Sequence, residues 1–190
     1  HLPDSDERLM RIILRGKEQL ENFMKDFLLL ARATPGAPER VNTREIIEEV
    51  LEAIQYVPDW HEGIEIQKDL MGNAFVHANR TEIKQLIVNL VLNGIQAMPV
   101  KGALHIETSI GEGNGLPGCL HISVRDTGCG IAGKDLQNVF EPFYTTKERG
   151  TGLGLAIVNR IVEYNKGEIK IVSEAGNGTR CLVKLPLMRE

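Results

Sequence analysis

The chain has 190 residues, 42% of them apolar, which is enough for one domain of ordinary size with an additional element. Its formal net charge of −4 argues against a nucleic-acid partner, because proteins that bind nucleic acids usually carry basic surfaces. Three cysteines without metal-ligand spacing favour a reducing cytoplasm over a disulfide scaffold, and no apolar run reaches the roughly 18–20 residues that span a membrane.

The N-terminal segment, residues 4–33, has the pattern of one long helix that packs against other helices. Apolar or small residues recur at alternating steps of four and three, which is the heptad seam of a coiled coil or a four-helix bundle. One helix cannot bury such a seam alone, so we expect it to pair with a helix of a second copy or with one missing from this chain. The seam residues are Leu9, Ile13, Gly16, Leu20, Phe23, Phe27 and Leu30.

Two prolines and a glycine separate this helix from the rest of the chain. Pro35, Gly36 and Pro38 stop the helix and begin a stiff linker, which we place at 35–42. The remainder predicts an α/β two-layer sandwich, with helices on one face of a mixed sheet. We expect helices at 43–57, 80–97 and 152–165, and strands at 64–70, 74–78, 103–110, 119–126, 167–174 and 179–186.

The predicted helix 80–97 carries two asparagines in an otherwise apolar run. Asn89 and Asn93 are four residues apart and therefore lie on one face of the helix. Asparagines that face a core need hydrogen-bond partners, and they could satisfy buried backbone groups. A second interpretation is that their amide oxygens face a magnesium ion and its phosphates, since magnesium prefers oxygen ligands.

A first glycine cluster follows the predicted strand 119–126. Gly128 and Gly130 let the backbone turn and approach a flat ligand closely. Asp126 directly precedes them, and its carboxylate can accept a hydrogen bond from an exocyclic amine such as that of adenine. A plain hairpin turn is an alternative, because glycine turns with one acid are common.

A second glycine cluster leads into the predicted helix 152–165. Gly150, Gly152 and Gly154 precede an apolar-periodic run, so the free amides of the helix start can point at phosphates. About twenty residues separate the two clusters, and they predict a mobile flap, or ATP lid, anchored on both sides of a nucleotide.

In their order and spacing, these motifs resemble the catalytic domain of two-component sensor histidine kinases. The superfamily also holds DNA gyrase, the ninety-kilodalton heat-shock chaperone and MutL-type ATPases. The N box matches at Asn89 and Asn93, and the F box at Phe140 and Phe143. The glycine boxes match at Asp126, Gly128 and Gly130, and at Gly150, Gly152 and Gly154. The resemblance covers roughly 41–186.

The resemblance implies an ATP site that requires Mg²⁺. It assigns Asn93 as the direct magnesium ligand, with help from Asn89, and Asn89 and Lys147 as the catalytic residues. One departure is Gln96, where many kinases of the family place a basic residue that touches phosphate. The implied ATP-binding residues are Asn89, Asn93, Asp126, Gly128, Gly130, Ile131, Phe143, Thr146, Lys147, Gly150, Thr151, Gly152, Leu153, Gly154, Leu155 and Thr179.

Asn89 indicates which reaction this site performs. In the ATP-hydrolysing relatives and the related serine kinases, a glutamate base takes this position, and an amide cannot deprotonate water or a hydroxyl. A histidine nucleophile brings its own lone pair, so the resemblance implies transfer of the γ-phosphoryl to histidine. Two alternatives stay open: an ATPase or serine kinase of the superfamily, and an ATP-gated dimerisation scaffold without kinase activity.

The resemblance also implies the domains and partners. Residues 1–34 resemble the second helix of a dimerisation hairpin, and 43–190 the catalytic ATP-binding domain. His1 is followed by Leu2, Pro3 and Asp4, which does not match the motif around the phosphoacceptor histidine, so we expect that histidine to be absent from this chain. The implied partners are a second copy of the chain and the receiver domain of a response regulator, whose aspartate accepts the phosphoryl group. We expect a cytoplasmic location, with any membrane contact made only by segments absent here.

Overall fold

The computed structural model describes residues 4–31, 34–72, 74–113, 116–147 and 150–188. The prediction that His1 is not the phosphoacceptor concerns a residue outside these ranges. The helices are α1 (Asp4–Ala31), α2 (Thr43–Ala53), the short 3₁₀ helix η1 (Ile54–Tyr56), α3 (Arg80–Gln96) and α4 (Gly154–Tyr164). The strands are β1 (Glu39–Asn42), β2 (Ile64–Leu70), β3 (Phe75–Ala78), β4 (Gly102–Gly113), β5 (Leu116–Asp126), β6 (Glu168–Ser173) and β7 (Thr179–Pro186).

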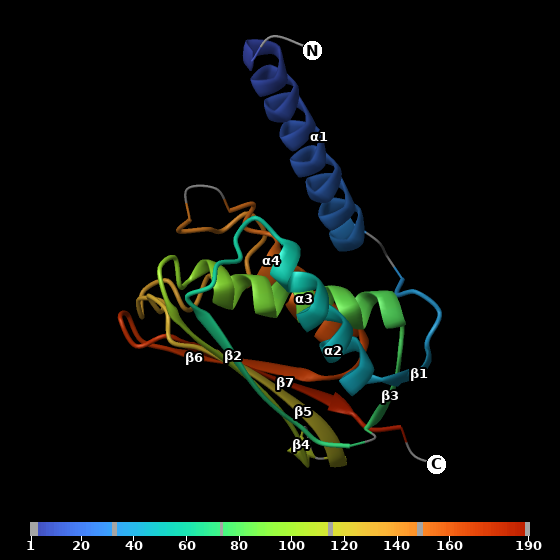
Figure 1. Cartoon of the computed structure of the whole chain (residues 1–190). Coiled ribbons are helices and arrows are strands. Elements are labelled where there is room, and N and C mark those ends of the chain that lie inside the picture. The colour runs from blue at the N-terminus through green and yellow to red at the C-terminus, as the bar shows by residue number, and fades with distance from the viewer. Residues whose placement is uncertain (1–3, 32–33, 73, 114–115, 148–149, 189–190) are drawn as a thin grey trace.

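The domain is a two-layer α/β sandwich, as the sequence predicts. Five strands form one sheet in the order β2-β4-β5-β7-β6. The β2–β4 pair is parallel and the other pairs are antiparallel, so the sheet is mixed. Helices α2, α3 and α4 cover one face of this sheet, and α1 projects away from the layers (Figure 1).

The prediction for β3 was wrong in one respect. This strand does not join the main sheet but pairs with β1 in a separate two-stranded sheet, with Val41 opposite Val76. The predicted linker 35–42 was correspondingly too long, because its last four residues form β1. Residues 39–42 contain a single apolar side chain, so no alternation marks them as a strand, and a partner distant in sequence creates the element.

The predicted helix 43–57 was also too long. Helix α2 ends at Ala53, and Val57 takes an extended conformation with ψ of 151°. Pro58 follows, and the residue before a proline avoids the helical region.

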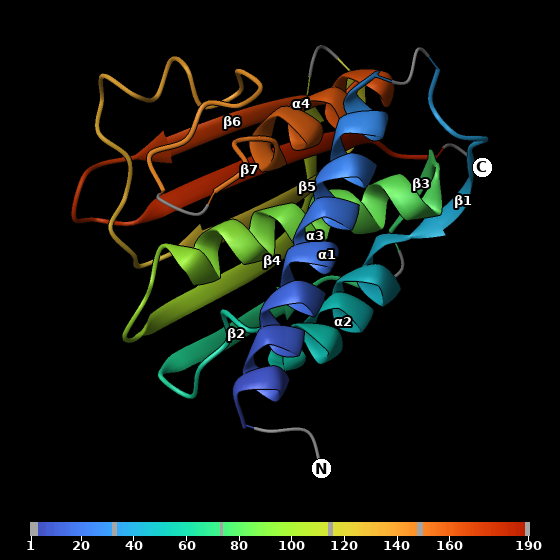
Figure 2. The same cartoon turned by 90° about the horizontal axis from the view of Figure 1, so that it is seen from above.

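Helix α3 lies at the centre of the helical layer. It contacts α2, α4 and the strands β4 and β5, and Figure 2 shows it between α2 and α4 over the sheet. Its apolar side chains are almost fully inaccessible to solvent, so the helix is held in place from several sides. These side chains are Ile83, Leu86, Ile87, Leu90, Val91 and Ile95.

Most of the seam of α1 does not contact the domain. Leu9, Ile13 and Leu20 are exposed by 57–63%. Near the end of the helix, Phe23 and Leu30 pack against the domain core. Within the described part of the chain, no helix combines the length and apolarity needed to cross a membrane.

Two side chains at the start of α3 hold the linker. Asn79 accepts from the backbone N–H of Glu82 at 3.1 Å and donates through Nδ2 to Ala37 O at 3.1 Å. The buried carboxylate of Glu82 accepts from the N–H of Gly36 at 2.8 Å. The linker is therefore attached to the helix that carries the predicted asparagines.

Candidate functional site

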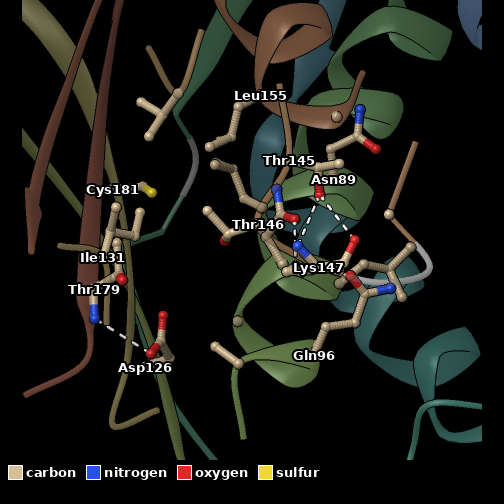
Figure 3. Close-up of a pocket in the computed structure, with 18 of the residues that line it drawn as sticks. Asn89, Gln96, Asp126, Ile131, Thr145, Thr146, Lys147, Leu155, Thr179 and Cys181 are labelled. Atoms are coloured by element: carbon tan, nitrogen blue, oxygen red, sulfur yellow. Dashed lines mark hydrogen bonds between the residues drawn. The ribbon is translucent and has the colours of Figure 1, made fainter. Parts of the chain in front are cut away.

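A cavity of about 420 Å³ opens between the sheet and the helical layer. Its walls come from α3, the ends of β5 and β7, the start of α4 and a segment at 132–147, which we call the flap segment (Figure 3). Thirteen of the predicted site residues line this one cavity, although they span 91 positions of the chain. They are Asn89, Asn93, Asp126, Gly130, Ile131, Thr146, Lys147, Gly150, Thr151, Gly152, Gly154, Leu155 and Thr179.

Three predicted residues lie outside the lining. A side chain at Gly128 would overlap the backbone carbonyl of Ala97, so this glycine permits close packing of chain on chain. Leu153 is fully buried at the N-terminal cap of α4. Phe143 is 56% exposed, with a positive φ of 69°, and so is not a core residue.

Several lining residues were not predicted from the sequence. Cys181 follows Thr179 by two positions on β7, and Val124 precedes Asp126 by two on β5, so strand alternation could have found both. Other lining residues of the flap segment belong to no helix or strand, and no periodicity could have found them. They are Asp135, Val139, Tyr144 and Thr145.

Asp126 is a buried carboxylate at the sheet end of the cavity. It is 6% exposed, and its Oδ1 accepts from the backbone N–H of Gly128 at 2.8 Å and of Thr179 at 3.2 Å. Burial raises the pKa of Asp126 above its usual value, although these two hydrogen bonds and the charge of Lys147 oppose the shift. Both backbone donors use the same oxygen.

Asn89 and Asn93 present their amides from α3 to the other side of the cavity. Asn89 is 8% exposed, and within the described structure its buried Nδ2 has no hydrogen-bond partner. Such a buried donor costs free energy until a ligand or water accepts from it. The Oδ1 of Asn93 accepts from the ammonium of Lys147 at 3.1 Å.

The fold requires glycine at one position of the second cluster but not at another. Gly152 has a φ of +69°, and a side chain there would overlap the backbone of Phe143, so the fold itself requires this glycine. At Gly154 an added methyl group would find its nearest atom, Asn93 Nδ2, at 3.5 Å, which is ordinary contact. Gly154 starts α4, and no side chain caps that helix. The first amides of α4 therefore have no side-chain acceptor at the cap, and Gly154 and Leu155 line the cavity.

Consecutive turns fix part of the flap segment. Backbone N–H groups of Asp135, Asn138, Glu141 and Tyr144 each donate to the carbonyl three residues earlier. The hydroxyl of Tyr144 donates to Asp135 at 2.7 Å, which closes the segment on itself.

Lys147 connects the flap segment to α3. The side chain as a whole is exposed, but its ammonium donates to Asn93 Oδ1 at 3.1 Å and to Gln96 Oε1 at 2.8 Å. Gln96 in turn donates through Nε2 to Asp59 Oδ2 at 2.8 Å. Desolvation lowers the pKa of Lys147, while interactions with Cys129, Asp126 and Asp59 oppose the shift.

Carboxylates are scarce in this cavity. Among the described lining residues only Asp126 and Asp135 are acids, and both accept hydrogen bonds from the protein. Helix α3 contributes amides and no carboxylate to the wall that it forms. That wall can therefore bind cations and hydrogen-bond donors, but it has no side chain that would take a proton at neutral pH.

A family model for "Histidine kinase-, DNA gyrase B-, and HSP90-like ATPase" matches residues 78–189, which is more than half of the chain. The chain belongs to this ATPase family. Within it, the relatives are sensor and sporulation kinases. Sporulation kinase C of Bacillus subtilis (strain 168) is 33% identical over 182 residues, which cover 93% of this chain and 40% of that kinase. The chain thus spans less than half of this relative.

Solved structures of histidine kinases are also similar to this chain. The catalytic domain of the histidine kinase ThkA, in a nucleotide-free form, is 29% identical, with a TM-score of 0.66 over 78% of this chain and 95% of that one. Full-length ShkA in complex with AMPPNP superposes with a TM-score of 0.83 over all of this chain and 40% of its own, at 24% identity. This second match concerns the fold alone.

The raised pKa of Asp126 has a consequence for stability. A carboxyl group whose pKa is higher in the folded state stabilises the fold below its unfolded pKa of about 3.8, and this contribution is lost as the pH rises through the folded pKa. Ionised Asp126 therefore costs stability at pH 7. We expect Asp126→Asn to raise the urea midpoint at pH 7, with a gain that shrinks towards pH 4, where the wild type is increasingly protonated.

The control is Asp69→Asn, at an exposed position in β2. A lower midpoint for Asp126→Asn at pH 7 would show that the two backbone hydrogen bonds outweigh the cost of burial.

Proposed function

We propose that this chain binds Mg-ATP in the cavity and transfers the γ-phosphoryl group to a histidine of a dimerisation hairpin. The observation that carries the proposal is the wall formed by α3, which presents the amide of Asn89 where a water-activating enzyme needs a carboxylate. Histidine needs no such base, because its ring nitrogen already has a lone pair.

The adenine is assigned to the sheet end of the cavity. Both backbone donors of Asp126 use Oδ1, so Oδ2 is assigned to the exocyclic amine of the base. A buried carboxylate that costs the fold stability is typical of a binding group. Gly130, Ile131 and Thr179 line the same end.

The phosphates are assigned to the start of α4. Amides at a helix N-terminus attract anions, and the residues 150–155 bring several of them to the cavity wall. Lys147 and Thr146 lie beside them on the flap segment. A side chain at Gly154 would meet no protein atom closer than ordinary contact, so the protein itself does not require glycine here. The absent side chain instead allows a phosphate to approach the backbone closely.

Magnesium fits the oxygens of α3. In this structure the ammonium of Lys147 already lies on Asn93 Oδ1, so that oxygen is placed to accept a cation. Asn93 would hold the ion, with Asn89 beside it, because amide oxygens are hard ligands that magnesium accepts. When bound, the ion would neutralise phosphate charge.

The protein contributes positioning and charge stabilisation to the transfer. A histidine ring nitrogen attacks the γ-phosphorus, and the bond to the bridging oxygen breaks, giving phosphohistidine and ADP. The protein has little covalent work in such a step. Lys147 supplies positive charge near the terminal phosphate, and the amide of Asn89 orients the groups around it without taking a proton.

The domains and partners follow from the long helix. We assign α1 to the second helix of the hairpin and residues 43–190 to catalysis, with the linker between them. The exposed seam residues Leu9, Ile13 and Leu20 suit a homodimer through hairpin helices. The phosphoryl group would then pass from the histidine to an aspartate of a response regulator. The flap segment would act as an ATP lid that rearranges when nucleotide binds. We place the reaction in the cytoplasm.

Gly154→Ala separates binding from folding. An added methyl group meets only ordinary contacts, and alanine favours a helix over glycine, so we expect an unchanged or slightly higher unfolding midpoint. The methyl group would block the phosphates, so affinity for Mg-ATP should fall by at least about tenfold, or roughly 1.4 kcal/mol, in calorimetric titration. Gly133→Ala, with nothing within 4 Å, is the control. Unchanged affinity in Gly154→Ala would place the phosphates elsewhere.

The function itself is tested by adding a hairpin that bears a histidine. With radiolabelled ATP and Mg²⁺, we expect acid-labile, base-stable label on the hairpin, and none when its histidine is replaced. Label on a hydroxyl side chain would indicate a serine kinase. Nucleotide binding without any transfer would instead favour an ATP-gated scaffold.

A further inference from the structure

Two hydrogen bonds hold the flap segment to α3, and a third attaches Gln96 of α3 to Asp59; the proposed reaction does not require them. Asp59 accepts from Gln96 Nε2 at 2.8 Å, and Gln96 Oε1 accepts from Lys147 at 2.8 Å. Lys147 also donates to Asn93 Oδ1 at 3.1 Å. Figure 3 shows Lys147 close to Gln96, on the side of the cavity away from Asp126.

The chemistry of each member sets the direction of these hydrogen bonds. A carboxylate only accepts hydrogen bonds, so Asp59 requires the NH₂ group of Gln96 to face it. The carbonyl oxygen of the same amide then points to Lys147, where it accepts from the ammonium. Asp59 therefore orients Gln96, and Gln96 fixes the position of Lys147.

Lys147 occupies the oxygen that the proposed function assigns to magnesium. An ammonium and a divalent cation on the same amide oxygen would repel each other strongly at such short range. Both cannot occupy Asn93 Oδ1 together, so Mg-ATP must displace the lysine before it binds there.

We propose that Asp59 and Gln96 hold Lys147 as a lock on the magnesium ligand Asn93, so that the free protein favours a state that cannot accept Mg-ATP. The inference rests on the proposed function and adds a regulation of the same site. Asp59 and Gln96 act as positioning residues through Lys147. The apparent affinity is then the intrinsic affinity reduced by the fraction of molecules in the unlocked state.

Truncation of the positioning residues tests the lock. Gln96→Ala and Asp59→Ala should each tighten Mg-ATP binding by about three- to tenfold in calorimetric titration, which corresponds to a free protein that is unlocked for roughly a third to a tenth of the time. Gln137→Ala, at an exposed position of the flap segment, should bind like the wild type.

A double-mutant cycle shows whether the effect passes through the lysine. In a Lys147→Ala background, Gln96→Ala should no longer change the affinity, since there is no ammonium left to position. An effect of the same size in that background would overturn the proposal, as would unchanged or weaker binding in Gln96→Ala alone.

Hydrogen exchange without nucleotide tests the lock independently of ATP binding. Loss of Gln96 or of the lysine ammonium should raise amide exchange in residues 144–147 by at least about threefold, with no change around β5. Unchanged exchange in both variants would overturn the lock. If the wild type fails to bind Mg-ATP, the proposed function fails, whereas faster exchange in Gln96→Ala would still show that Gln96 holds the flap segment through Lys147.

Discussion

The site depends on the burial of α3. Its apolar side chains pack against the sheet, α2 and α4, so the helix cannot shift or rotate without opening the core. Polar residues that lie between these apolar positions are therefore carried on a rigid support. Asn89, Asn93 and Gln96 project from it into one wall of the cavity, and the linker is tied to its first turn.

Several groups around the cavity cost the fold stability. Facing α3, the opposite wall contributes a buried carboxylate at Asp126 and a start of α4 without a side-chain cap, and α3 itself contributes the amide nitrogen of Asn89, which has no partner in the described structure. Desolvated and unpaired groups are unfavourable in the free protein, and a ligand that satisfies them recovers that cost on binding. Their gathering around one cavity is consistent with a site adapted to a polar, charged ligand.

Much of the fold was predictable because its signals are local. Alternating or helical periodicity placed α3, α4 and the five main strands within a few residues, and the spacing of Asn89 and Asn93 placed both on one face. β1 was not predictable, because its strand conformation comes from pairing with β3 rather than from its own side chains. The chain from Asp59 through Gln96 to Lys147 joins three separate segments, and only the fold brings them together.

The most direct test of the account is a titration of this chain with ATP, with and without Mg²⁺, while phosphate release is followed in the same sample. We predict saturable binding that requires Mg²⁺, with almost no release of phosphate, because the α3 wall offers amides and no base to water. Rapid, steady release would reveal a base that activates water, and absence of binding would show that the cavity is not a nucleotide site. Either result would contradict the account.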